Sequence, residues 1–278
     1  MSQVEGIKNN SNITQDSLEI VASKLSTSEA DFRLRKALLQ YLLDTNLHKG
    51  VIDSRVEYRR VLQPKGEEPK YKPEDVAQGY SFSAEKLILI LRYALENADI
   101  KEGDSIMLPF CGMGSLPAFL TAQGFNITGS DILYSDPNQF SYDPVFNIEL
   151  FRKKIAGIFP DLHLGKYKFM RADAQNLPIE DDSVGIIIAV PPFNVKCKIP
   201  SNNGIELFNR AAKESLRILK NGGSAFYVIP KTWLGAIDPS LKAKVICEDI
   251  IQNRESNLPL SILEIEKGEP VIQKESVM

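Results

Sequence analysis

The sequence has few of the residues that hold metal ions or form disulfides. Its 278 residues include three cysteines and two histidines, and no two cysteines have the close spacing of a metal-binding pair. We therefore expect no structural zinc site and no other metal centre. An odd and low number of cysteines also indicates a reducing compartment rather than a disulfide framework. These residues are Cys111, Cys197, Cys247, His48 and His163.

The sequence also lacks a long apolar run and an excess of positive charge. Its longest apolar stretch, residues 186–193, is too short to cross a bilayer and contains two prolines. The first ten residues lack the apolar core of a signal peptide, so we expect a cytoplasmic protein with no membrane partner. The net charge of −3 excludes the global basic field that gathers nucleic acid non-specifically.

The pattern of apolar residues divides the chain into three parts. Residues 1–14 are polar and rich in Asn and Ser, which predicts a disordered tail. Residues 15–80 are predicted to be a helical extension, because apolar residues recur at helical spacing and Ser28 begins a second helix. This extension has enough apolar positions to dock on the rest of the chain or on a protein partner. Residues 81–278 form the main domain.

Positive charge gathers in residues 33–72. This segment holds ten Lys and Arg against five acidic residues, a local net charge of +5, with three tyrosines between them. Such a segment could contact the phosphates of RNA or DNA, and the alternative is an ordinary solvated face. The ten residues are Arg33, Arg35, Lys36, Lys49, Arg55, Arg59, Arg60, Lys65, Lys70 and Lys72.

From residue 82 onward the pattern predicts alternating helices and strands. Residues 184–190 are continuously apolar and β-branched, as a central parallel strand should be. We therefore predict an α/β fold with a doubly wound, mostly parallel, Rossmann-like sheet. The predicted helices are 84–97, 115–123, 145–159 and 204–219; the predicted strands are 105–108, 125–131, 167–171, 184–190 and 224–229, with a turn at 221–223 and a hairpin of 260–264 with 271–274.

The first predicted strand runs into a glycine-containing loop and then a helix. Gly112 and Gly114 would let the backbone turn tightly and approach a ligand closely. Ser115 could cap the helix, whose free N–H groups favour an anionic group. Since ligands of such sheets sit at the carboxyl ends of the strands, this junction is the expected site of a nucleotide-like ligand.

Two aspartates follow the next two strands. Asp131 lies 19 residues after Gly112, and its carboxylate could accept hydrogen bonds from two ribose hydroxyls. Asp173 follows the third strand and could accept one from the exocyclic amine of adenine. A dinucleotide site would have a third glycine at position 117, where this sequence has Pro117, which argues against NAD.

The fourth strand ends in Val190-Pro191-Pro192-Phe193. Two consecutive prolines hold the chain rigidly, and the ring of Phe193 could stack on a planar substrate such as an extruded base. The alternative is a loop that only stops the strand. Lys231 and Trp233 follow the fifth strand and could reach the substrate side of the cleft, or could be a surface lysine and a packing indole.

Residues 81–233 resemble the class I S-adenosylmethionine-dependent methyltransferases, and most of all the amino-methyltransferases of nucleic acids, which include tRNA guanine-N2 and adenine exocyclic-amine enzymes. Their first loop typically reads DPFCGSGT and their fourth-strand loop (D/N)PP(Y/F); here these are LPFCGMGS and VPPF. The stretches RADAQNLPIEDDSVGIIIAVPPF and RILKNGGSAFYVIPKTW are similar as well. The resemblance covers about 150 of the 278 residues.

This resemblance implies a fold that binds S-adenosyl-L-methionine. Gly112 and Gly114 would face its methionine portion, Asp131 its ribose and Asp173 its adenine. The cofactor-binding set that it implies is Pro109, Phe110, Gly112, Gly114, Asp131, Asp173 and Ala174, and the catalytic set is Val190, Pro191, Pro192 and Phe193.

Two positions depart from the family pattern. Leu108 stands where the first loop begins with Asp, and Val190 where the catalytic loop has the Asp or Asn that accepts a hydrogen bond from the target amine. Valine offers no side-chain acceptor, and one such contact is worth roughly 2.7–4 kcal/mol in the transition state. The backbone carbonyls of Val190 and Pro191 remain as acceptors.

Three functions are therefore open. The first is a methyltransferase that acts on an exocyclic amine of a nucleic-acid base, with RNA favoured over DNA. The second is a catalytically inactive protein of this fold that serves as a binding or partner subunit. The third is a methyltransferase of small molecules. Asp131 and Asp173 favour cofactor binding in all three.

Overall fold

The computed structural model describes residues 10–45, 84–112, 114–132, 144–192, 204–252 and 259–268. They belong to two units. We call the first the helical unit; it comprises the described residues within 1–104, 111–127 and 135–169. We call the second the sheet unit; it comprises those within 105–110, 128–134 and 170–278.

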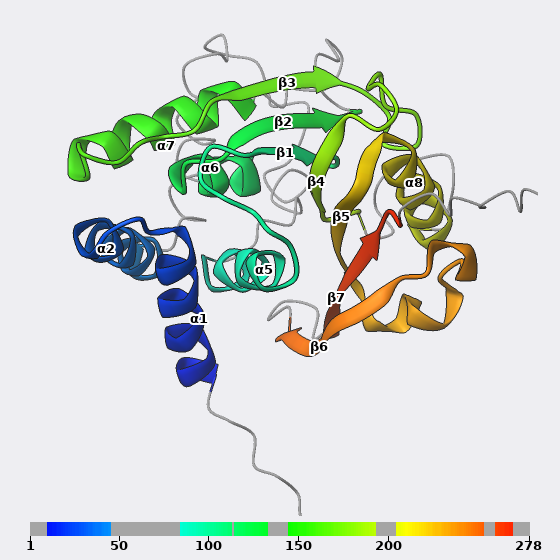
Figure 1. Ribbon diagram of the computed structural model, residues 1–278, viewed down its shortest axis with the longest axis horizontal. Coiled ribbons are helices and arrows are strands. Elements are labelled where there is room, and N and C mark those ends of the chain that lie inside the picture. The colour runs from blue at the N-terminus through cyan, green and yellow to red at the C-terminus, as the bar shows by residue number, and fades with distance from the viewer. Residues whose placement is uncertain are drawn as a thin grey trace, which may run out of the picture. The chain divides into compact units, whose positions relative to one another are not determined.

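A seven-stranded sheet has the order β3-β2-β1-β4-β5-β7-β6 (Figure 1). β1 pairs in parallel with β4 and β4 with β5, while β7 runs antiparallel to both β5 and β6. The order from β3 to β5 is that of a doubly wound sheet, so the predicted mostly parallel, Rossmann-like α/β fold is confirmed. The strands are β1 (Ser105–Leu108), β2 (Asn126–Asp131), β3 (Tyr167–Arg171), β4 (Val184–Ala189), β5 (Leu219–Pro230), β6 (Lys244–Gln252) and β7 (Pro259–Glu266).

The core of the sheet unit forms between the central strands and α8 (Gly204–Ile218). Phe208 of α8 meets Tyr227 of β5 edge-to-face, with ring centroids 5.1 Å apart. Burial raises the pKa of Tyr227 above its ordinary value, so its hydroxyl stays protonated and donates to the carbonyl of Ala211 at 3.2 Å. Ser215 lies 2.7 Å from the same hydroxyl. The buried hydroxyl of Tyr227 therefore has hydrogen-bond partners within the core, as buried polar groups require.

Two local predictions for the end of the sheet are wrong. β5 begins at Leu219, not at Ser224, because Leu219 pairs with Val184 and the register then shifts before Ile186 pairs with Ser224. The predicted turn at 221–223 is thus part of the strand. The strand predicted at 260–264 exists as β7, but β5 and β6 pair with its two edges. The predicted hairpin partner 271–274 lies outside the described residues.

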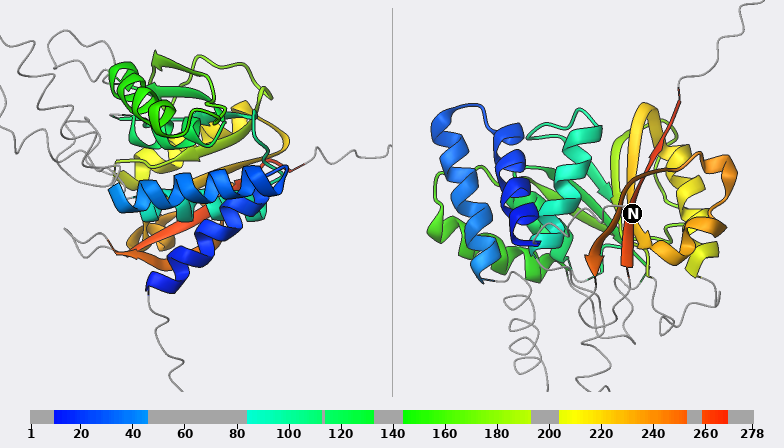
Figure 2. Two further views of the ribbon diagram at one scale, coloured as in Figure 1. Left: turned by 90° about the vertical axis from the view of Figure 1, so that its left-hand side faces the viewer. Right: turned by 90° about the horizontal axis from the view of Figure 1, so that it is seen from below.

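Five helices are described in the helical unit. In Figure 2, α1 and α2 lie side by side, and both contact α5. α1 begins at Asn10, within the segment expected to be a tail. No helix in the described parts of the chain is long and apolar enough to span a membrane. The helices are α1 (Asn10–Leu25), α2 (Glu29–Thr45), α5 (Ala84–Asn97), α6 (Ser115–Ala122) and α7 (Pro144–Ile158).

The start of α2 is the one predicted. The hydroxyl of Ser28 accepts a hydrogen bond from the backbone N–H of Asp31 at 3.2 Å. The carboxylate of Asp31 in turn accepts one from the backbone N–H of Thr27 at 3.0 Å. This reciprocal pair satisfies two N–H groups that have no partner inside the helix, and it explains why α2 begins here.

Arg35 of α2 is a buried cation, with its side chain 4% exposed. Its guanidinium donates to the carboxylate of Glu102 at 2.5 Å and to the carbonyl of Gln123 at 3.1 Å. The second bond supplies a partner for a carbonyl at the C-terminus of α6, where a positive charge is also favoured by the helix dipole. Asp31 forms an ion pair with Arg35 at 2.9 Å. The side chain of Arg35 therefore joins α2 to Glu102, which precedes β1 in the sequence, and to Gln123, which follows α6.

We expect Arg35→Met to destabilise the protein by about 3 kcal/mol, because it leaves Glu102 and Asp31 without their buried cation. The matched control is Arg33→Met. Arg33 pairs with Glu29 at the same helical spacing, but its side chain is 77% exposed, and such pairs contribute about 0.3–0.5 kcal/mol. Urea unfolding followed by circular dichroism measures both. Equal losses in the two variants would contradict the buried role of Arg35.

Candidate functional site

The first loop has the backbone shape that its glycines predict. Gly112 and Gly114 have φ of 53° and 89°, and Phe110 also has a positive φ of 59°. The N–H of Gly114 donates to the carbonyl of Cys111 at 3.2 Å, which closes the turn. A Cβ at Gly112 would meet no atom of the described residues within 4 Å. Pro109 is buried and Phe110 half-buried.

The cap of α6 differs from the prediction. Gly114 is the capping residue, with no side-chain hydrogen bond, and Ser115 is the first residue of the helix. The left-handed conformation of Gly114 turns the chain directly into α6, which leaves Ser115 one position too late to cap. Leu108, which stands where the family has Asp, is completely buried at the end of β1. Its place suits an apolar side chain.

The structure brings the ends of β2 and β3 together. The N–H of Ala172 donates to the carbonyl of Asp131 at 3.3 Å, so the residue before Asp173 is bonded to the last residue of β2. Both aspartates are half-buried. Two carboxylates that follow neighbouring strands of one sheet edge are the arrangement that the sequence predicted.

Asp173 is held in a tight local turn. Its Oδ1 accepts hydrogen bonds from the backbone N–H of Gln175 at 2.9 Å and from the side-chain amide of Gln175 at 3.2 Å. Its carbonyl accepts from the N–H of Asn176 at 2.9 Å, and Ala174 between them is buried. The same amide also donates to Oδ2 at 3.3 Å. Since a carboxylate has about four lone-pair positions, Asp173 keeps one for an outside amine. Gln175, which orients this carboxylate, was not predicted from the sequence.

The loop after β4 is described as far as Pro192. Val190 and Pro192 are half-buried and Pro191 is buried. Phe193 lies outside the described residues, so its stacking role stays a prediction. Because Ala189 pairs with Tyr227, the loop begins level with the last residues of β5.

Trp233 belongs to this end of the sheet. It lies in the 3-10 helix η1 (Lys231–Ala236), which directly follows β5. A Cβ on Gly204, the first residue of α8, would lie 2.7 Å from the indole and 3.4 Å from the carbonyl oxygen of Pro192. The indole also contacts Phe208, with ring centroids 6.5 Å apart. Trp233 thus packs where the loop after β4 and the start of α8 meet. Of the two alternatives raised above, the packing indole is the one seen.

Lys231 and the described basic residues are engaged in ion pairs. Lys231 pairs with Glu248 at 3.2 Å. Within the basic segment 33–72, Arg33 pairs with Glu29, Lys36 with Glu19, and Arg35 is buried. The other seven basic residues lie outside the described residues. Contact of this segment with RNA or DNA stays a prediction that now concerns those seven residues.

Comparison with known proteins found backbone similarity to class I S-adenosylmethionine-dependent methyltransferases. TrmN from Thermus thermophilus is 18% identical with a TM-score of 0.44; the alignment covers 69% of this chain and 52% of TrmN, so the chain spans about half of that protein. A SAM-dependent methyltransferase from Methanosarcina mazei is 18% identical with a TM-score of 0.40 over 61% of this chain and 95% of that one. No family model and no curated protein matches the chain.

A Listeria monocytogenes protein described as a class I S-adenosylmethionine-dependent methyltransferase is 15% identical, with a TM-score of 0.47. That alignment covers 93% of this chain and 81% of the other. At such identities and TM-scores the neighbours say nothing about cofactor or substrate. The function proposed below therefore rests on the residues of this chain.

We expect Gly204→Ala to destabilise the protein by about 1–3 kcal/mol, because the new methyl group overlaps the indole of Trp233. Without that overlap, alanine at the start of a helix would be neutral or favourable. The cost should therefore disappear in a Trp233→Leu background, where the ring is absent. Urea unfolding of the two singles and the double variant measures it.

The control is Gly235→Ala, in the 3-10 helix η1 that also holds Trp233. A Cβ on Gly235 would meet no atom of the described residues within 4 Å. An equal cost of Gly204→Ala with and without the indole would show that the packing contact is not the cause.

Proposed function

We propose that this protein is an S-adenosylmethionine-dependent methyltransferase. The observation that carries the proposal lies within the sheet unit. Asp131 ends β2, and its carbonyl accepts a hydrogen bond from the N–H of Ala172, the residue before Asp173. Residues 190–192 follow the end of β4. In doubly wound sheets this edge binds nucleotide-like ligands.

The residues present fit the cofactor. A half-buried carboxylate at Asp131 suits two ribose hydroxyls, which donate hydrogen bonds, and Asp173 suits the exocyclic amine of adenine, which also donates. The donors of the ligand thus face acceptors of the protein at both aspartates.

The protein's contribution to the reaction is alignment and exclusion of water. When bound, S-adenosylmethionine supplies an electrophilic methyl group. The chain supplies a rigid Pro191-Pro192 turn, a buried apolar floor at Leu108, and the backbone carbonyl of Val190 as an acceptor for the attacking amine.

For the acceptor we propose an exocyclic amine of a nucleic-acid base, with RNA favoured over DNA. Two features of the sequence support it: the VPPF sequence after β4, and the segment 33–72 with its ten Lys and Arg against five acidic residues. The aromatic ring of Phe193, which follows the two prolines in the sequence, suits a base that has left its stack.

A second candidate is a non-catalytic binding or partner subunit. Val190 favours it, because a valine side chain cannot accept a hydrogen bond from the target amine. The identity of Leu108 favours it as well, since the family pattern has an acidic group at that position. In this case the cofactor site would persist and the transfer would be lost.

Titration calorimetry with S-adenosylhomocysteine tests the cofactor site. We expect micromolar binding, and Asp131→Ala should weaken it by roughly 10- to 100-fold, because hydrogen bonds to a charged group contribute about 1.5–3 kcal/mol. Asp99→Asn is the control, since Asp99 is 83% exposed and pairs only with a surface lysine in the described contacts. Absence of binding by the unaltered protein would overturn the proposed function.

Val190→Asp tests the acceptor that the family pattern supplies at this position. If the amine reaches Val190 but lacks a side-chain acceptor there, the new carboxylate should raise methyl transfer to RNA by up to about 100-fold without changing the affinity for S-adenosylhomocysteine. The measurement is incorporation of labelled methyl groups into RNA at saturating cofactor. If neither the unaltered protein nor the Val190→Asp variant transfers methyl groups, while both bind S-adenosylhomocysteine, the non-catalytic candidate is favoured.

A further inference from the structure

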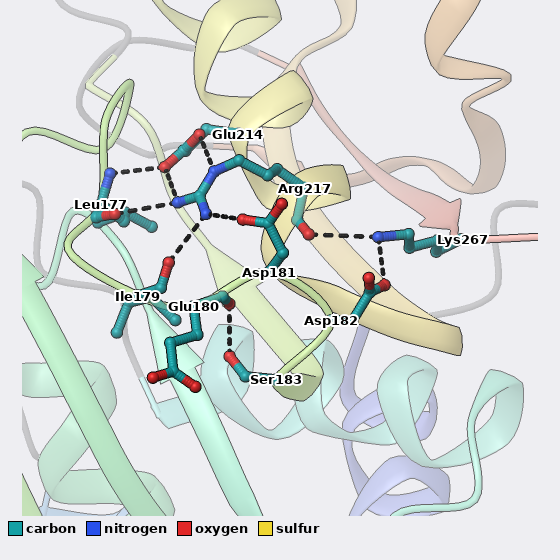
Figure 3. Close-up of polar contacts among 9 residues, drawn as sticks. All are labelled: Leu177, Ile179, Glu180, Asp181, Asp182, Ser183, Glu214, Arg217 and Lys267. Atoms are coloured by element: carbon teal, nitrogen blue, oxygen red, sulfur yellow. Dashed lines mark hydrogen bonds and ion pairs between the residues drawn. The ribbon is translucent and has the colours of Figure 1, made fainter.

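The segment between β3 and β4 is tied to α8 by side chains of the helix. Figure 3 shows Glu214 and Arg217, both from the last turns of α8, reaching residues 177–181 of that segment. Asp173 is the second residue of this segment, four residues before Leu177. The same stretch of chain therefore carries the carboxylate of the proposed adenine site and the attachment to α8.

Arg217 uses its whole guanidinium for this attachment. It donates to the carbonyl of Leu177 at 3.0 Å and to that of Ile179 at 2.9 Å. It also forms ion pairs with Asp181 and, at 2.6 Å, with Glu214. Hydrogen bonds to Glu214 and Asp181 raise the pKa of Arg217 above its ordinary value, so the side chain stays charged. Only a planar fork of donors can reach these partners together.

Glu214 completes the attachment from the same side. Its Oε1 accepts a hydrogen bond from the backbone N–H of Leu177 at 2.7 Å, while both its oxygens hold Arg217. The side chain of Glu214 is 10% exposed. Leu177 is thus held through both its N–H and its carbonyl, by one carboxylate and one guanidinium that orient each other.

The far end of the segment is held through the backbone of α8. The N–H groups of Asp182 and Ser183 donate to the carbonyls of Arg217 and Ile218, at 3.2 and 2.9 Å. Lys267 joins the carboxylate of Asp182 to the carbonyl of Arg217, as Figure 3 shows.

The attachment and Asp173 share one surface. Asp173 and Gln175 line an open hollow together with Glu214 and Arg217, and with Arg210 and Lys213 of the same helix. Arg210 pairs with Glu206 and Lys213 with Asp238, so those two cations are engaged within the surface of the unit. Glu214 and Arg217 are the members of this set that bond the backbone next to the Asp173 turn.

We propose that Glu214 and Arg217 are positioning residues that set the selectivity of the cofactor site for adenine. By holding Leu177 they hold the turn of Asp173, and so the direction in which its carboxylate accepts a hydrogen bond. The inference rests on the proposed function, because it concerns how the ligand's base is recognised. The geometry predicts a specific defect in base selectivity when the attachment is loosened.

The experiment compares S-adenosylhomocysteine with S-inosylhomocysteine by titration calorimetry. The second ligand carries a carbonyl oxygen in place of the exocyclic amine and has no proton there to donate to Asp173. We expect the unaltered protein to prefer S-adenosylhomocysteine by about tenfold or more, the worth of one hydrogen bond to a charged acceptor. Arg217→Lys keeps the charge but loses the fork, and the preference should fall to about threefold or less.

Glu214→Gln is the second variant, since it keeps the shape and an acceptor for Leu177 but removes the charge that orients Arg217. It should lower the preference in the same direction, and it stands in if Arg217→Lys does not fold by circular dichroism. Arg210→Lys is the matched control on the same helix and in the same hollow, and it should keep the full preference.

The possible outcomes distinguish a failure of this inference from a failure of the proposed function. Equal weakening of both ligands in the Arg217 and Glu214 variants would mean a general structural role and would overturn the inference. A normal preference in these variants would overturn it too. If the unaltered protein binds both ligands without preference, the inference fails while the cofactor site stands. If it binds neither ligand, the proposed function itself fails.

Discussion

The parallel pairing of β4 with β1 on one side and β5 on the other is the constraint on which the sheet unit depends. Ile186 and Ile187 lie opposite Ile106 and Met107, while residues 187–189 lie opposite 225–227. A strand hydrogen-bonded along both edges cannot shift without breaking both ladders, and a shift of one residue would turn its apolar side chains to the wrong face. The carboxyl end of β4 therefore leaves the sheet at a fixed point.

This fixed point decides which chemical groups the site offers. Val190 and Pro191 present main-chain carbonyls where the family pattern has a side-chain acceptor, and Leu108 is buried where that pattern has a carboxylate. The carboxylates that remain, Asp131 and Asp173, are at the ends of β2 and β3. The carboxylates of Asp131 and Asp173 thus lie on the side proposed for the cofactor, and the described part of the loop proposed for transfer, Val190 to Pro192, has none. That asymmetry is what makes the two candidate functions distinguishable.

One helix supports both sides of the sheet's carboxyl edge. The first residue of α8, Gly204, meets Trp233 beside Pro192, and its last turns hold Leu177 through Glu214 and Arg217. Phe208 anchors the helix on Tyr227 between these two regions. The loops after β3 and β4 therefore depend on the same packed element. A disturbance of α8 would reach both the proposed base-recognition turn and the loop of Val190.

Local pattern was sufficient for most elements of this chain. The apolar run at 184–190 predicted β4 and its central place, and glycine at positions 112 and 114 predicted the turn into α6, because both follow from the preferences of short stretches of backbone. The order of the loops predicted which aspartates end β2 and follow β3. These features need no knowledge of distant partners.

Other features depend on partners far along the chain, and the sequence by itself could not supply them. A strand pattern shows which face is apolar but not which strand lies alongside, so the place of β7 between β5 and β6 and the early start of β5 were decided by the whole sheet. Arg35 looks like a surface cation until Glu102 and Gln123 are seen around it. Likewise, Gly204 and Trp233, or Leu177 and Arg217, meet only through packing. The sequence determined the elements and their chemical groups, and the tertiary structure decided which groups meet. The reason is that contacts between residues far apart in the sequence depend on the packing of the whole chain and not on the preferences of short segments.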